Sequence, residues 1–195
     1  YTNFLDEDGG VHADLTISRL GKDSYRVVTG GADGNRDWVT LRNYRDDMGL
    51  NADIKIRTHD IATLGLWGPQ AKNALGNFID PNELAIENFP FAAAKNLTLN
   101  LSERKKINVW ASRISYVGES GWELYLNNDP EDGLALYDSF LEVGVVPVGI
   151  ETYANSRRLE KSFRLQGADL ETDYNACESA IERRLVKEAD FHGKE

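Results

Sequence analysis

Cysteine is almost absent from this chain of 195 residues, because Cys177 is the single one. An internal disulfide is therefore excluded, and a lone thiol favours a reducing compartment, so the sequence predicts a cytoplasmic protein. Histidine is also scarce: the three histidines lie in unrelated segments, and no ligand spacing connects them to the cysteine. The sequence thus predicts no metal site.

Basic residues and long apolar runs are scarce as well. Lysine and arginine total 22 against 32 acidic residues, which gives a net charge of −10 and a pI near 4.8. A nucleic acid or an anionic membrane needs a basic surface, so neither is expected as a partner. The longest apolar run, "VGVVPVGI" at residues 143–150, is far too short to span a bilayer and contains a proline.

The hydrophobic pattern alternates between the periods of strands and of helices. It predicts an α+β protein with mixed or antiparallel sheets and helices packed on them. Expected strands cover residues 11–19 and 25–29 as a hairpin, then 54–56, 61–68, 95–101, 107–116 and 122–126. Expected helices cover residues 36–48, 69–78 with Pro69 in the first turn, 130–144 capped by Asp129, and 150–163. Three tryptophans are expected in the core: Trp67, Trp110 and Trp122.

Asp14 is unusual because it lies in the middle of the first predicted strand. Aspartate is a poor strand former, and its carboxylate is costly to desolvate. His12, Thr16 and Ser18 share its face. This polar face either meets water or lines a pocket, and we interpret His12 as an ordinary member of it.

Five blocks of the sequence together resemble a known family. They are "GGVHADLTISRL", "LGLWGPQAKNAL", "SYVGESGWELYL", "YANSRRLEKSFRLQGADL" and "KEADFHGK", in this order. The blocks resemble the folate-dependent aminomethyltransferases, the family of the glycine-cleavage T-protein. Within it, the match is greatest to the folate-binding C-terminal half of dimethylglycine and sarcosine dehydrogenases. The resemblance implies the central part of the T-protein-like folate-binding fold over residues 1–186. It also implies the start of a C-terminal barrel domain at 187–195.

The resemblance implies that tetrahydrofolate is the cofactor and that two residues bind it. Glu123, in "WELYL", occupies the place of the family carboxylate that binds the pterin edge. A reduced pterin presents a ring N–H beside an exocyclic amine, and one carboxylate can accept both hydrogen bonds. Tyr116 is the matching aromatic residue, which can stack on the ring or donate its hydroxyl. Without the resemblance, Glu123 would be interpreted as an ion-pair partner and Tyr116 as a core residue.

Asp14 corresponds to the family aspartate near the folate nitrogens, so the resemblance implies an acid/base role for it. The expected reaction transfers a methylene unit from a small methylated amine, such as dimethylglycine or sarcosine, and gives methylenetetrahydrofolate. Two alternatives stay open: a non-catalytic scaffold or regulatory subunit, and a folate-dependent demethylase of oxygen- or sulfur-linked methyl groups. The basic residues Arg157, Arg158, Lys161 and Arg164 are expected on a solvated helix face with salt bridges to Glu151 and Glu160.

Some features depart from the family pattern. Tyr153-Ala154 stands where the T-protein has a folate-contacting arginine, which favours the dehydrogenase branch. Ala176 and Ala180 stand where proline and glycine are expected. No FAD-binding segment is visible, so FAD is expected in a missing segment or an oxidoreductase partner. The chain opens at Tyr1 without methionine, and we expect a fragment of a longer protein, in the mitochondrial matrix if eukaryotic.

Overall fold

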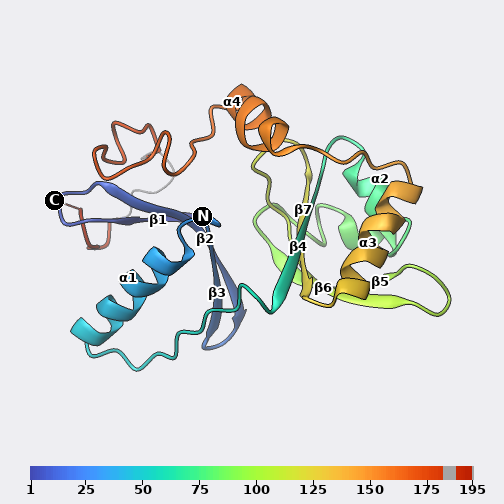
Figure 1. Cartoon of the computed structure of the whole chain (residues 1–195), viewed down its shortest axis with the longest axis horizontal. Helices are drawn as coiled ribbons and strands as arrows, with labels where there is room; N and C mark the ends of the chain where they lie inside the picture. Colours follow the sequence, from blue (N-terminus) through green and yellow to red (C-terminus); the bar gives the residue numbers. More distant parts are fainter. Residues whose placement is uncertain (182–187, 195) are drawn as a thin grey trace. The chain divides into compact units, whose positions relative to one another are not determined.

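The structure is a computed structural model that describes residues 1–181 and 188–194 (Figure 1). The chain forms two compact units. Unit 1 comprises Tyr1–Lys55 and Arg164–Glu195, and unit 2 comprises Ile56–Phe163. Unit 2 is therefore one continuous segment, whereas unit 1 is built from two segments that flank it in the sequence. The predicted domain boundary between residues 186 and 187 lies outside the described residues.

Unit 1 contains a three-stranded antiparallel sheet. Its strands β1 (Thr2–Leu5), β2 (Val11–Gly21) and β3 (Ser24–Thr29) are adjacent in that order. The predicted hairpin of β2 and β3 is confirmed by their register. On β2, Val11, Ala13 and Leu15 are buried, and the polar residues between them are half-buried. The alternation therefore separates an apolar face from a polar face, as the sequence predicts.

Helix α1 (Gly34–Asp47) follows β3 and confirms the helix predicted over 36–48. Its buried Asp37 connects the two elements, because the Thr29 hydroxyl at the end of β3 donates to the Asp37 carboxylate. Arg36 also pairs with this carboxylate at 2.9 Å. A buried carboxylate is tolerated here because it has both a hydrogen-bond donor and a counter-charge.

The strand predicted at 54–56 is wrong. Residues 50–57 form neither helix nor strand. Within the described residues no strand pairs with this segment, and the Ile56 side chain is 48% exposed. The alternating isoleucines thus lack both a neighbouring strand and an apolar surface to cover, and without these a period-2 pattern does not make a strand.

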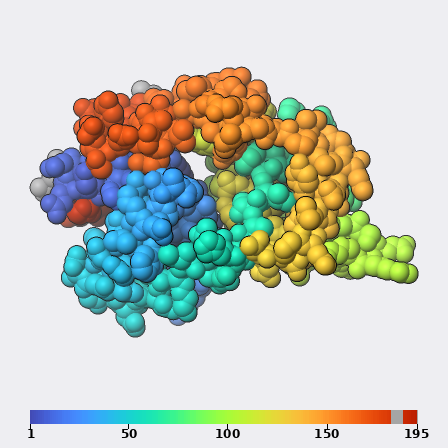
Figure 2. Space-filling model, in the orientation of Figure 1, coloured from blue at the N-terminus to red at the C-terminus, as the bar shows by residue number. Residues whose placement is uncertain are grey.

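Unit 2 contains a four-stranded sheet in the order β4–β7–β6–β5, and each neighbouring pair is antiparallel. The strands are β4 (Ile61–Trp67), β5 (Ala94–Asn100), β6 (Lys106–Ser112) and β7 (Gly121–Asn127). Antiparallel sheets with packed helices confirm the predicted α+β class. The tip of the β5–β6 hairpin, yellow-green, projects from the surface (Figure 2). Strand β7 lies inside the sheet, so its side chains are flanked by those of β4 on one side and β6 on the other.

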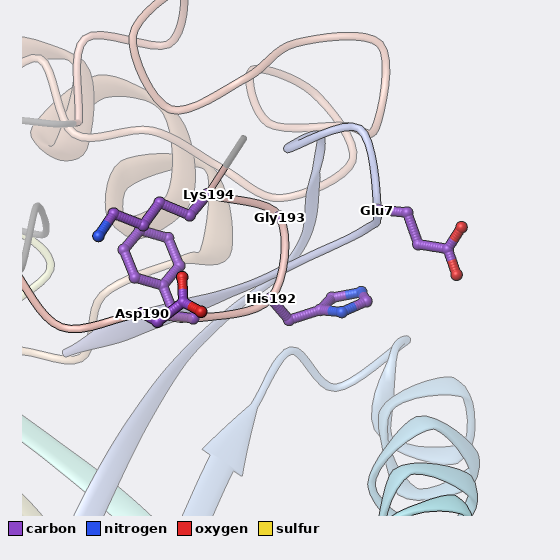
Figure 3. A pocket seen from close by; sticks show the side chains of 6 residues that line it. Glu7, Asp190, His192, Gly193 and Lys194 are labelled. Carbon is purple, nitrogen blue, oxygen red and sulfur yellow. The ribbon is translucent and has the colours of Figure 1, made fainter.

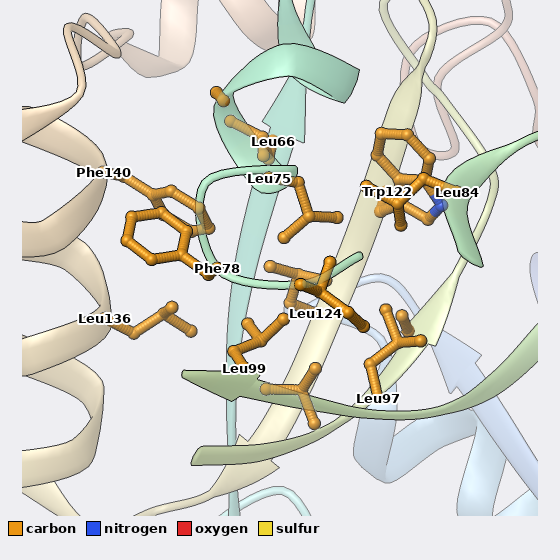
Figure 4. Packing of buried hydrophobic residues seen from close by; sticks show 14 of the residues in the cluster. Leu66, Leu75, Phe78, Leu84, Leu97, Leu99, Trp122, Leu124, Leu136 and Phe140 are labelled. Atoms are coloured by element: carbon orange, nitrogen blue, oxygen red, sulfur yellow. The ribbon is translucent and has the colours of Figure 1, made fainter. Parts of the chain in front are cut away.

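The core of unit 2 covers one face of this sheet (Figure 4). Trp122 and Leu124 of β7 are fully buried there and pack with Leu136 and Phe140 of α3. Three helical elements complete the core: α2 (Ala71–Leu75), the 3₁₀ helix η1 (Pro81–Leu84) and α3 (Pro130–Glu142). Asp129 caps α3 as predicted, with its side chain accepting from the Glu131 N–H at 2.9 Å.

Two of the predicted elements are shorter than expected. Helix α2 begins at Ala71, so Pro69 lies before the helix rather than in its first turn. The Asn77 side chain donates to the carbonyls of Asn73 and Ala74, at 2.9 and 3.0 Å, and helps to end the helix. Strand β6 ends at Ser112 rather than at residue 116. There the Ile114 N–H donates to the Ser112 carbonyl at 3.0 Å in a tight turn.

The helix predicted over 150–163 is partly correct. The chain is helical over residues 150–160, with a π-helical stretch η2 (Thr152–Arg157) followed by α4 (Arg158–Glu160). Ser162 then takes a φ of +56°, and the Phe163 N–H returns to the Arg158 carbonyl at 3.0 Å. This left-handed residue ends the helix before the predicted limit.

Candidate functional site

Glu123 lies on the face of the unit 2 sheet that is opposite the core. Its strand neighbours Trp122 and Leu124 point into the core, so alternation directs Glu123 to the other side. Its register partners are Gly65 on β4 and Ser112 on β6. The side chain is half-buried, which is uncommon for a carboxylate, because most carboxylates lie on the solvated surface.

Tyr125 provides the hydrogen bond to this carboxylate. It lies two residues after Glu123 on the same face of β7, and its hydroxyl donates to Glu123 Oε2. Burial raises the pKa of Glu123 above its ordinary value, and the hydrogen bond from Tyr125 acts in the opposite direction. No basic residue is involved in either effect, so the ion-pair interpretation of Glu123 receives no support from the described structure.

A stacked pair of aromatic rings lies on the same face. The rings of Trp67 and Tyr153 have centroids 5.3 Å apart and planes 23° apart. The Trp67 indole N–H donates to the Ile114 carbonyl at 2.9 Å, which fixes the orientation of the ring. Burial and the nearby charge of Glu123 raise the pKa of Tyr153 to about 12. Tyr153 is therefore close to the carboxylate and uncharged at neutral pH.

Gly65 makes room for the Trp67 ring. A Cβ atom at Gly65 would lie 2.0 Å from Cη2 of Trp67, so the indole ring lies directly over this glycine. Gly65 is also the register partner of Glu123. The absence of a side chain at this position thus lets an aromatic ring lie beside the carboxylate.

Tyr116 lies in the loop between β6 and β7, close to the same aromatic residues. Its ring centroid is 5.5 Å from that of Tyr153, at a tilt of 54°. The ring of Phe163 also lies near it, with centroids 6.2 Å apart and planes 21° apart. The structure therefore brings both predicted binding residues of unit 2 to Tyr153, with Glu123 acting on it electrostatically and Tyr116 in ring contact.

Arg157 of η2 makes an ion pair with the loop that carries Tyr116. Arg157 pairs with Glu119 of the loop at 2.8 Å and with Glu160 at 3.0 Å. The predicted salt bridge to Glu160 is confirmed. The prediction that Arg158 lies on a solvated helix face is wrong. Its side chain is buried and donates to the carbonyls of Ala154 and Phe163. The Glu151 carboxylate accepts from the Asn155 side chain.

Asp14 lies at the centre of β2 in unit 1. It is half-buried, and burial raises the pKa of its carboxyl group, while a hydrogen bond with Tyr1 opposes the rise. Its register partner on β1 is Asn3. Asp14 Oδ1 and both polar side-chain atoms of Asn3 are buried without a hydrogen-bond partner among the described residues. The sequence left two settings open for Asp14, open water or a polar pocket. Its partial burial agrees better with a polar pocket.

His12 shares the face of Asp14 and has an ordinary partner. Its Nε2 atom lies 3.1 Å from the Thr40 hydroxyl of α1. This contact agrees with the interpretation of His12 as a polar-face residue. In the part of the chain that the structure describes, no three histidine, cysteine, aspartate or glutamate residues form a group that could hold a metal ion.

A shallow pocket of about 350 Å³ in unit 1 is lined by none of these residues (Figure 3). Glu7, Asp190, His192, Gly193 and Lys194 line it together with the Phe191 ring. In Figure 3 the His192 and Lys194 side chains point in opposite directions rather than toward a common centre. The pocket thus has mixed charge and no convergent polar groups, so it is a weak candidate for a binding site.

Comparison with known proteins identifies the family. The model of the GCVT N-terminal domain matches residues 1–188, which is nearly the whole chain. The chain belongs to this family, and the predicted resemblance is confirmed. Among solved structures, the glycine cleavage system aminomethyltransferase T from Bartonella henselae matches with a TM-score of 0.77 and 25% identity. The match covers 98% of this chain and 49% of that one.

Curated relatives agree with this assignment. Mitochondrial dimethylglycine dehydrogenase from Homo sapiens is 36% identical over 200 residues, and the enzyme from Rattus norvegicus is 34% identical over the same length. Both matches cover 100% of this chain but 22% of the relative, so the chain spans about a fifth of the length of these proteins. Among the described residues no helix has the length and apolarity needed to cross a membrane.

Sequence reasoning did not assign three side chains around Glu123 to the site. Trp67 was predicted as core, like Trp110 and Trp122. Trp122 is fully buried as predicted, whereas Trp67 and Trp110 are half-buried and project, by strand alternation, from the opposite face. Tyr125 had a usable signal, because a residue two positions from Glu123 in a strand shares its face. Tyr153 had an indirect signal, because Tyr153-Ala154 stands where the T-protein has a folate-contacting arginine, but its proximity to Glu123 depends on how η2 packs against the sheet.

Proposed function

We propose that this chain binds tetrahydrofolate and takes part in the transfer of a one-carbon unit from a small methylated amine. Membership of the GCVT N-terminal domain family supports the class of reaction. The similarity to dimethylglycine dehydrogenases supports a donor such as dimethylglycine or sarcosine. The observation that carries the proposal is a half-buried carboxylate, Glu123, among the aromatic side chains of Tyr125, Tyr153 and Trp67.

The surroundings of Glu123 fit a reduced pterin. A flat heterocycle is bound well by apolar, aromatic walls with a polar group that fixes its orientation. Tyr125 donates to Oε2 of Glu123, and the second oxygen and the remaining lone pairs can accept from a ring N–H and an exocyclic amine. Tyr116 is proposed to contribute its ring or its hydroxyl to the same ligand.

Asp14 is proposed as the acid/base group. A carboxylate whose pKa is raised by burial exchanges protons closer to neutral pH than a solvated one does. Bound tetrahydrofolate would supply the nitrogen atoms that accept the methylene unit. Asp14 would take a proton from the attacking amine through a carboxylate oxygen. The carbon–nitrogen bond of the donor would break as the methylene carbon becomes bonded to a folate nitrogen, and Asp14 would return the proton to the departing demethylated amine.

Oxidation of the amine is assigned to FAD in another segment of a longer protein or in an oxidoreductase partner. The described residues are proposed to serve the folate half-reaction alone. In a eukaryote the mitochondrial matrix is the proposed location, since the dimethylglycine dehydrogenases similar to this chain are mitochondrial.

The first test is a calorimetric titration of the chain with tetrahydrofolate. In Glu123→Gln an amide donor faces the donors of the ligand, which should cost about 1–3 kcal/mol, corresponding to a Kd weakened by about 5- to 150-fold. Glu87→Gln, which changes an exposed glutamate of the same unit, is the matched control. Saturable binding that Glu123→Gln weakens and the control does not would support the proposal. Binding that is equal in all three proteins would overturn the role of Glu123.

The second test separates an enzyme from a scaffold. Asp14→Asn should retain tetrahydrofolate binding but lose formation of methylenetetrahydrofolate from a supplied aminomethyl donor, because the amide cannot take the proton. Asp23→Asn, an exposed aspartate in the turn before β3, is the control and should keep full turnover. Unchanged turnover in Asp14→Asn would remove Asp14 from the chemistry. Binding without turnover in every protein would favour the scaffold.

A further inference from the structure

The phenol of Tyr125 has no role in the one-carbon chemistry proposed above, and yet it is both buried and hydrogen-bonded. Its side chain is 7% exposed, and its hydroxyl donates to Glu123 Oε2. Buried tyrosine hydroxyls normally have a partner, and here that partner is the half-buried carboxylate proposed to bind the ligand.

The sheet fixes this contact. Tyr125 and Glu123 are two residues apart on β7 and thus share a face. Strand β7 is internal, and Tyr125 has Thr63 of β4 on one side and Trp110 of β6 on the other. Backbone hydrogen bonds to two neighbouring strands hold the ring in place, so the carboxylate has its donor before any ligand arrives.

The hydrogen bond also affects which form of Glu123 is present. The ligand proposed for this site has two donors, so it needs the ionised carboxylate as acceptor. Burial favours the neutral acid, and it raises the pKa of Glu123. The Tyr125 hydroxyl opposes that rise because it donates to the charged form. Tyr153 is a further titratable group near this carboxylate, and it stays uncharged at neutral pH because its pKa is about 12.

We propose that Tyr125 is a positioning residue that holds the Glu123 carboxylate ionised and oriented, with one oxygen engaged and the other presented to the ligand. This inference rests on the proposed function of Glu123. It assigns to Tyr125 a contribution to ligand affinity without contact with the reacting atoms.

The test compares the full chain with Tyr125→Phe and with Tyr137→Phe, a partly exposed tyrosine of α3 that serves as control. Tyr125→Phe keeps the ring and its packing and removes the hydroxyl alone. Carbon-13 NMR of the labelled glutamate carboxyl groups follows Glu123 during a pH titration without ligand, and Glu123→Gln identifies its signal. We expect Glu123 to titrate at higher pH in Tyr125→Phe than in the wild type, and at an unchanged pH in the control.

Tetrahydrofolate titrations then provide a readout that a purely structural role would not change. Tyr125→Phe should bind about ten-fold more weakly at neutral pH, the loss expected for one hydrogen bond to a charged group. The loss should grow as the pH falls, because less of Glu123 is then ionised in the variant than in the wild type. In a Glu123→Gln background, Tyr125→Phe should cost little further affinity, since its effect passes through the carboxylate.

An unchanged titration of Glu123 in folded Tyr125→Phe would overturn the inference, as would a loss of affinity that is the same at every pH. The two proposals fail in different ways. If Glu123→Gln leaves folate binding intact, the proposed function of Glu123 fails, while the ligand-free titration still reports whether Tyr125 controls the carboxylate.

Discussion

The two units each place one half-buried carboxylate in the middle of a strand, but they surround it differently. Asp14 of unit 1 shares its face with the polar side chains of His12 and Thr16 and has Asn3 as its register partner. Glu123 of unit 2 has aromatic neighbours and a tyrosine donor. Polar surroundings suit a group that exchanges protons, whereas aromatic walls suit a group that orients a flat ligand. We therefore propose different tasks for these two carboxylates.

The units also differ in how their cores are built. The large hydrophobic cluster among the described residues belongs entirely to unit 2 and connects its sheet with α2, η1 and α3. In unit 1 the buried hydrophobic residues among those described are four: Val11, Ala13, Leu15 and Leu170. Unit 2 should therefore depend strongly on individual core side chains, and unit 1 less so.

Removal of a core side chain should test this difference with the largest effect. Leu124→Ala in unit 2 should lower the free energy of unfolding by about 2–5 kcal/mol, because a fully buried leucine leaves a cavity. Leu134→Ala on α3, where the side chain is 62% exposed, is the control and should cost far less. Urea denaturation followed by tryptophan fluorescence measures both. A Leu15→Ala loss as large as that of Leu124→Ala would contradict the comparison of the units.

Gly65→Ala should have the next largest effect. The added Cβ would displace the Trp67 ring, and overpacking of this kind costs about 1–3 kcal/mol. Gly133→Ala is a control with the opposite sign: nothing lies near its position in α3, and alanine is the better helix former, so it should stabilise by about 0.5–1 kcal/mol. Thermal unfolding compares the two variants, and an unchanged Tm in Gly65→Ala would contradict the close approach.

The effect of pH on Glu123 is smaller and has a definite sign. The folded chain raises the pKa of Glu123 above the ordinary value of 4.5, so between these two values the folded state binds more protons than the unfolded one. The contribution of Glu123 to stability therefore falls as the pH rises through this window. Glu123→Gln should gain stability relative to the wild type over the same window, because the amide carries no charge that burial disfavours. Thermal unfolding at a series of pH values measures this. A difference in Tm between Glu123→Gln and the wild type that stays the same at every pH would contradict the burial of this charge.

The smallest expected effect concerns Ala180 in unit 1. Its φ of +55° is the left-handed conformation that favours glycine, which agrees with the family pattern in which glycine is expected there. Ala180→Gly should stabilise the chain by about 0.5–1 kcal/mol. Ala176→Gly, four residues earlier and without a positive φ, should not stabilise it. Chemical denaturation measures the free energy of unfolding of both variants. Equal changes in this free energy for Ala180→Gly and Ala176→Gly would argue against strain at Ala180.

Local patterns predicted much of the fold. The β2–β3 hairpin, α1, and α3 with its Asp129 cap follow from alternation, helical spacing and capping chemistry within a few residues of sequence. The errors lie where local pattern competes with context. The segment around Ile54 and Ile56 alternates but pairs with no strand in the described structure.

The sequence by itself determined the α+β class, the family, and the strand positions of Asp14 and Glu123, because side-chain alternation and family motifs are local properties of the chain. The tertiary structure decided what surrounds those carboxylates. Trp67 lies over Gly65, and Tyr153 reaches Glu123 from a segment 30 residues away in the sequence, through the packing of η2 against the sheet. Burial and neighbours set the pKa of a carboxylate, and both are properties of the folded chain.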